Sequence, residues 1–89
     1  MDAPALRERL TNSLLRDVQE RDYPSVTMLD RVEEALATRE QLADYTEVLL
    51  EKIEGTPYPG IPLLDRVNGL LVRLEELERA EEQARDSDE

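Results

Sequence analysis

Two segments of this chain are near copies of each other, and the duplication restricts the possible folds more than any other property. Residues 23–36 read YPSVTMLDRVEEAL, and residues 58–71 read YPGIPLLDRVNGLL. A shift of 35 residues aligns seven identical positions out of fourteen, and fainter matches precede both copies. Self-similarity at a fixed period of this size is typical of helical-hairpin arrays. The sequence therefore predicts two similar units of about 35 residues.

Each unit consists of a Tyr-Pro pair between two segments with the apolar spacing of a helix. The first helix is expected to begin after Asp2, a good N-cap, and to end near Arg21, because Pro24 disfavours helical geometry at the residue before it. Its expected buried stripe recurs every four residues and consists of Leu6, Leu10, Leu14 and Val18. The Tyr ring of each pair is expected to cover the start of the next helix.

The second helix is expected to begin at Ser25 or Val26, with Leu29, Val32 and Leu36 facing inward. Thr38 and Gln41 then match a capping box, in which Thr caps a new helix and Gln reaches back to it. This pattern predicts a break at residues 37–39 and a third helix from Arg39, with Leu42, Tyr45, Leu49 and Ile53 on its buried side. No Gly or Pro interrupts residues 26–54, so one long bent helix is the alternative.

The last helix is expected to follow Gly55, a strong stop signal, and to run from about Pro62 to about Ala84. Its apolar residues step by four and three, as in a coiled coil: Leu63, Val67, Leu70, Leu74 and Leu77. The rest of so short a chain offers few side chains to cover this face, and an uncovered row of Leu favours self-association. The sequence therefore predicts a homodimer that forms through the apolar face of the last helix.

Together these patterns predict an all-α fold: a small helical bundle of two tandem helix–(Tyr-Pro turn)–helix hairpins. It would contain four helices, or three if the second and third are continuous. We expect one domain over residues 1–84, with the first repeat at about 4–38, the second at about 39–77, and a frayed acidic tail at 85–89. The period is close to that of tetratricopeptide repeats, but the small and aromatic positions of that family are missing, so no family is assigned.

Composition excludes several classes of function. The 89 residues include no Cys and no His, and Asp and Glu outnumber Lys and Arg by 22 to 11, for a net charge of −11. This charge opposes direct binding to nucleic acid or to an anionic membrane. The N-terminus lacks an apolar signal core, and no apolar run is long enough for a membrane span. We therefore expect a cytoplasmic protein that contacts neither membranes nor nucleic acid directly.

Catalytic and cofactor signatures are missing from the sequence. A nucleophile needs a neighbouring base, and the single Lys, Lys52, lies among helical carboxylates. The pattern Glu-x-x-His that di-iron bundles use is also missing, as is a Gly-rich phosphate loop. We therefore expect no enzymatic activity, no metal and no cofactor.

The leading hypothesis is a non-enzymatic protein–protein interaction module, an adaptor or assembly factor with an unknown protein partner. The two Tyr-Pro turns, each with the start of the helix that follows it, could be packing elements retained after duplication. Alternatively, they could form paired recognition surfaces. The second interpretation selects Tyr23, Arg31, Tyr58 and Arg66, in addition to the apolar face of the last helix. The alternative function is a small acidic inhibitor or regulator that binds a basic, nucleic-acid-binding partner. A contiguous acidic ridge would favour that alternative, whereas acids scattered among Arg would indicate ordinary solubility.

Overall fold

A computed structural model describes residues 2–22 and 24–87, with side chains up to residue 84. Four helices make up this part of the chain, and it contains no strand: α1 (Ala3–Glu20), α2 (Val26–Ala35), α3 (Arg39–Glu54) and α4 (Ile61–Ser87). The all-α prediction and the count of four helices are confirmed.

The break between α2 and α3 follows from the predicted capping box. The Thr38 hydroxyl accepts a hydrogen bond from the Gln41 amide at 3.1 Å. In return, the Gln41 side chain accepts from the amides of Thr38 and Ala37 at 3.2 and 2.8 Å. These bonds satisfy donors that a helix start otherwise leaves unpaired. The two helices are therefore separate, and the alternative of one long bent helix is wrong.

Replacing Thr38 by Ala should lower the free energy of unfolding by about 1 kcal/mol, because the cap hydrogen bond is lost. Urea denaturation followed by far-UV circular dichroism measures the change. Thr27→Ala is the matched control: Thr27 is exposed inside α2 and caps nothing. Equal losses in the two variants would show that the capping box does not stabilise the chain.

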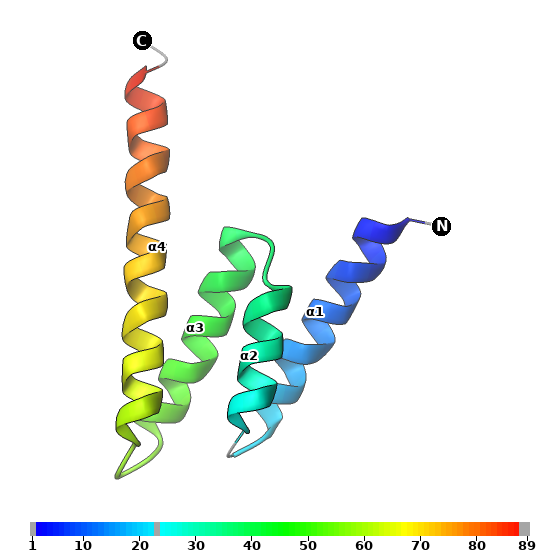
Figure 1. The fold of residues 1–89 in the computed structure, drawn as a ribbon, viewed down its shortest axis with the longest axis vertical. Coiled ribbons are helices and arrows are strands. Elements are labelled where there is room, and N and C mark those ends of the chain that lie inside the picture. Colours follow the sequence, from blue (N-terminus) through cyan, green and yellow to red (C-terminus); the bar gives the residue numbers. More distant parts are fainter. Residues whose placement is uncertain (1, 23, 88–89) are drawn as a thin grey trace.

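The helices form a flat, open arrangement. In Figure 1 they follow one another across the view in the order α1, α2, α3, α4, and the connection from α1 to α2 lies at the same end as the connection from α3 to α4. The helix α3 is central, since it packs against both α1 and α4, while α2 packs against α1. The Cα atoms extend over 48 × 37 × 18 Å with a radius of gyration of 14.9 Å. A compact chain of this length would have about 12 Å.

The core lies where the four helices meet near the turns. Its buried apolar side chains are Val18, Leu29, Val32, Leu42, Tyr45, Leu49, Val67 and Leu70. Leu36 and Ile53 are partly buried against this cluster. The inward faces predicted for the second and third helices are thereby confirmed.

The buried stripe predicted for α1 is wrong in its first half. Leu6 and Leu10 are exposed, at 43% and 56%, and only the residues nearer the turn join the core. The polar Thr11 is buried instead, and its hydroxyl donates to the carbonyls of Arg7 and Ala35 at 3.0 and 3.4 Å. Because α2 ends at Ala35 after only ten residues, it cannot cover the N-terminal half of α1.

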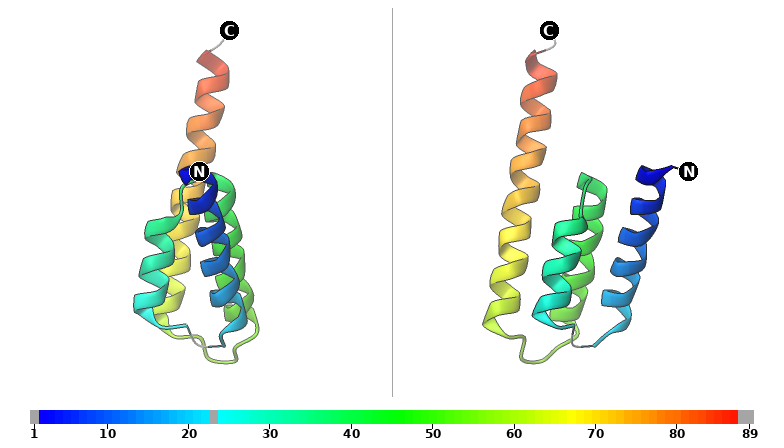
Figure 2. Two further views of the ribbon diagram at one scale, coloured as in Figure 1. Left: turned by 90° about the vertical axis from the view of Figure 1, so that its right-hand side faces the viewer. Right: turned by 45° about the vertical axis from the view of Figure 1, so that its right-hand side comes forward.

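The helix α4 is longer than predicted. It runs for 27 residues to Ser87, three residues past the expected end at Ala84, because residues 80–86 include no helix breaker and several strong helix formers. Its C-terminal part stands beyond the ends of the other helices (Figure 2). Residues 85–87 of the predicted frayed tail are therefore helical, and residues 88–89 lie outside the described part of the chain.

Candidate interaction surfaces

The face of α4 that the sequence assigned to an interface holds α4 to its own subunit. Val67 and Leu70 are buried in the core, and Leu63 and Leu74 pack partly buried against it. Leu77, the last of the five residues that the sequence pattern assigned to this face, is the only exposed one, at 39%. The interface role of this face stays a prediction, but Val67 and Leu70 cannot reach a partner while the core is intact.

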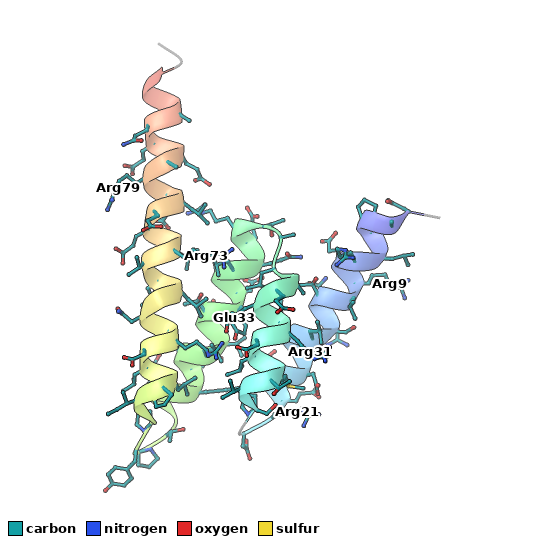
Figure 3. All side chains as sticks on the ribbon, viewed as in Figure 1. Arg9, Arg21, Arg31, Glu33, Arg73 and Arg79 are labelled. Carbon is teal, nitrogen blue, oxygen red and sulfur yellow. The ribbon has the colours of Figure 1, made fainter. Side chains whose placement is uncertain are left out.

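The residues selected at the two corners lie in different surroundings. Tyr23 lies outside the described residues. Tyr58 is 92% exposed, so its ring does not cover the start of α4 as expected. Arg31 is exposed on α2, and Figure 3 shows it on the opposite side of that helix from Glu33. Arg66, its counterpart in the repeat, is half-buried.

Arg66 connects α4 to α2 through two carboxylates. One nitrogen, Nη2, donates to Asp30 Oδ1 at 3.0 Å, and the other, Nη1, donates to Glu33 Oε2. Glu33 also accepts a hydrogen bond of 2.7 Å from the Tyr45 hydroxyl on α3. Three helices therefore meet in one polar network.

This network changes the acidity of two of its members. Burial, and then the hydrogen bond to the Glu33 carboxylate, raise the pKa of Tyr45 far above its ordinary value of 10.0. Partial burial works to lower the pKa of Arg66, but its hydrogen bonds to Glu33 and Asp30 raise that pKa above the ordinary value. Tyr45 and Arg66 consequently both stay protonated at physiological pH, which suits a structural brace better than proton transfer.

An apolar cavity of about 420 Å³ lies where the two turns meet. Its apolar lining comes from both turns and the helix starts that follow them: Pro24, Val26, Tyr58, Pro59, Pro62 and Leu63. The charged residues of the lining are Asp22, Lys52 and Arg66. Lys52 donates to the carbonyls of Gln19, at 3.1 Å, and of Arg21, so it caps the end of α1 and joins it to the last turn of α3.

The most exposed large apolar side chains of the described residues gather around this cavity. They are Tyr58 at 92%, Ile61 at 71% and Val26 at 61%. Tyr58 and Val26 line the cavity, and Ile61 lies between Gly60 and Pro62, which also line it. We call the cavity with these three side chains the turn-end patch. An exposed apolar surface next to a cavity is typical of a docking site.

A second candidate surface is a row of acidic side chains on α3. Five carboxylates step by four and three along the whole of α3: Glu40, Asp44, Glu47, Glu51 and Glu54. That spacing places them on one side of the helix, and all five are exposed. Among the side chains described, none of them forms an ion pair with Arg or Lys. We call these five residues the α3 carboxylate row; three of them, Asp44, Glu47 and Glu51, line a groove against α1 that also includes Arg16.

In the part of the chain described here, no group of three or more ligating side chains is placed to hold a metal ion. None of the helices, taken over residues 2–22 and 24–87, is both long and apolar enough to cross a membrane. Comparisons with known protein families, with curated proteins and with solved structures found no match.

Proposed function

We propose that this chain is a non-enzymatic protein–protein interaction module that forms a homodimer through the turn-end patch. The observation that carries the proposal is that Tyr58 and Val26, two of the three most exposed large apolar side chains described, line one apolar cavity, and the third, Ile61, lies in the chain between two residues that line it. The patch includes the first turn of α4, and it uses Tyr58 and Leu63, which the sequence had already selected. Apolar and aromatic side chains of this kind supply most of the binding energy in protein interfaces.

The chain also exposes more surface than a compact monomer of its mass would. Its accessible area is 6807 Å² for 10.2 kDa, whereas a compact monomer of that mass would expose about 5,300 Å². Part of the difference comes from the end of α4 that stands beyond the other helices. A stable interface buries about 800 Å² on each partner, so pairing would bring the exposed area closer to that of a compact protein.

A second copy suits the turn-end patch for two reasons. A two-fold symmetric dimer requires one surface that complements itself, and here an exposed Tyr58 ring stands beside a cavity of the same patch. In addition, the cavity is lined by one acid, Asp22, and two bases, Lys52 and Arg66. In a chain of net charge −11, this end can approach its own copy with less repulsion than the α3 carboxylate row would cause.

The tandem repeat fits the same proposal. The connections α1–α2 and α3–α4 lie side by side at one end of the molecule (Figures 1 and 2). We propose that duplication of a single hairpin supplied both halves of the patch. The adaptor or assembly role would then follow from a dimer whose remaining surfaces stay free for another protein.

The double variant Tyr58→Ser/Ile61→Ser should weaken the dimer at least a hundredfold, because each change removes an exposed apolar anchor from both copies. Sedimentation velocity over a range of protein concentrations measures the dissociation constant. Leu10→Ser is the matched control, since Leu10 is also exposed but lies on α1, outside the patch. Far-UV circular dichroism should show unchanged helicity in both variants.

Two results would contradict this proposal. A wild-type protein that stays monomeric at high concentration would exclude the homodimer. A dimer that survives the double variant but dissociates in Leu77→Ser would instead assign the contact to the apolar face of α4, as the sequence alone suggested.

A further inference from the structure

A second apolar surface runs along the junction of α3 and α4, away from the turn-end patch. Leu50, Leu64 and Leu71 remain between 39% and 41% exposed. Arg39 on α3 donates to Glu78 on α4 at 3.0 Å, so these two residues mark the sides on which the helices meet at the solvent. Any residue that shares one of these sides borders the same junction.

Helical spacing places the three leucines on those sides. Leu50 follows Arg39 by eleven residues, which is three turns of α3. Leu64 and Leu71 precede Glu78 by fourteen and seven residues, which is four and two turns of α4. Because α3 and α4 pack in opposite directions (Figure 1), the leucines form one strip along a single face of the molecule. We call it the leucine strip.

Acidic side chains border the leucine strip on both helices. The α3 carboxylate row lies beside it on α3, with Glu47 and Glu54 nearest to Leu50 by helical spacing. The other side of the row borders a groove against α1. On α4, Glu75 and Glu82 follow Leu71 by four and eleven residues and continue its side of the helix, and both are exposed. The face therefore combines a narrow apolar centre with one acidic edge, on α3, and an acidic extension beyond Leu71 along α4.

We propose that this face binds a cationic amphipathic helix of another protein. Apolar residues of that helix at every third or fourth position would cover the leucine strip, while its Lys and Arg would meet the α3 carboxylate row and, beyond Leu71, Glu75 and Glu82. A second copy of this chain would bring carboxylate row against carboxylate row, which like charges oppose. This surface is separate from the turn-end patch, and a cationic partner agrees with the acidic-regulator function that the composition suggested.

Fluorescence anisotropy with a labelled synthetic peptide tests this proposal. The probe is an amphipathic helix with Leu on one face and Lys and Arg on the other. One control peptide has Glu in place of every Lys and Arg, and another has Ser in place of every Leu. Only the probe should bind, and raising the salt from about 0.1 M to about 1 M should weaken its binding at least tenfold, because the screening length falls from about 10 Å to about 3 Å.

Matched variants of the protein then locate the site. Glu47→Gln/Glu51→Gln should weaken binding about three- to tenfold, whereas Glu20→Gln/Glu34→Gln, at exposed carboxylates of α1 and α2, should leave it unchanged. Leu71→Ser should weaken binding about tenfold, whereas Leu10→Ser should not. Circular dichroism on each variant verifies that the helices are retained.

If the Glu47→Gln/Glu51→Gln variant bound the peptide as tightly as the Glu20→Gln/Glu34→Gln control, the proposal would be overturned. Equal binding of the probe and the Ser-substituted peptide to the wild-type protein would also overturn it. The Tyr58→Ser/Ile61→Ser variant separates the two surfaces. It should lose the dimer and still bind the peptide with wild-type affinity, whereas a simultaneous loss of both would place the peptide on the turn-end patch.

Discussion

Leu49→Ala is expected to lower the free energy of unfolding by about 3 kcal/mol. Leu49 is completely buried in the core, on the helix that packs against both α1 and α4. Truncation removes apolar contacts and leaves a cavity that rigid helices fill only in part. Chains of this size have roughly 5 to 13 kcal/mol of stability in total, so this one change removes a large share of it.

The neighbouring residue provides the control for that experiment. Leu50→Ala makes the same chemical change in the same helix, but Leu50 is 39% exposed. Its cost should stay below about 1.5 kcal/mol, because less apolar area is returned to water. Urea or thermal unfolding of both variants measures the difference. Similar losses at the two positions would mean that α3 is not centred on the core as described.

The second large effect concerns alkaline pH and Tyr45. In the unfolded chain this hydroxyl ionises near its ordinary pKa of 10.0, whereas burial and the bond to Glu33 raise its pKa in the folded protein. Above pH 10 the unfolded state therefore binds fewer protons than the folded state. Stability is complete below pH 10 and falls as the pH rises, by up to about 1.4 kcal/mol per pH unit.

Urea unfolding at pH values from about 9 to about 11 measures this slope. Tyr45→Phe should remove Tyr45's contribution to it, because no hydroxyl remains to ionise, at a cost of about 1 kcal/mol at neutral pH for the lost hydrogen bond. Tyr58→Phe, at an exposed ring, should retain the slope. If the wild type and Tyr45→Phe respond identically, the Tyr45 hydroxyl is not held protonated by the fold.

These two experiments concern the core and its polar network, and they are independent of any partner. The network also explains why the two copies of the repeated motif are not equivalent in the structure. Arg66 is tied to Asp30 and Glu33 across the α2–α4 junction, whereas Arg31 is exposed. The same Asp-Arg pair thus serves packing in one copy and remains available at the surface in the other.

Helix boundaries could be read from short stretches of residues, because the forces that set them act within one turn. Pro24 ends α1, Thr38 and Gln41 separate α2 from α3, and α3 stops before Gly55. Apolar spacing likewise identified the buried sides of α2 and α3, since each helix has neighbours along most of its length. The α3 carboxylate row was equally readable from its regular spacing, yet its continuity was recognised only on the folded helix.

Which side chains of α1 and α4 are buried depends on the lengths and directions of the helices that pack against them. No local sequence pattern contains that information. Leu10 has the spacing of a core residue, but α2 ends too early to cover it. Val67 and Leu70 have the spacing of an interface, but α4 turns them toward its own core, and the leucine strip is exposed in their place. The bond between Glu33 and Arg66 spans 33 residues. Such pairings arise from how whole helices pack, because the area a side chain buries depends on what lies opposite it.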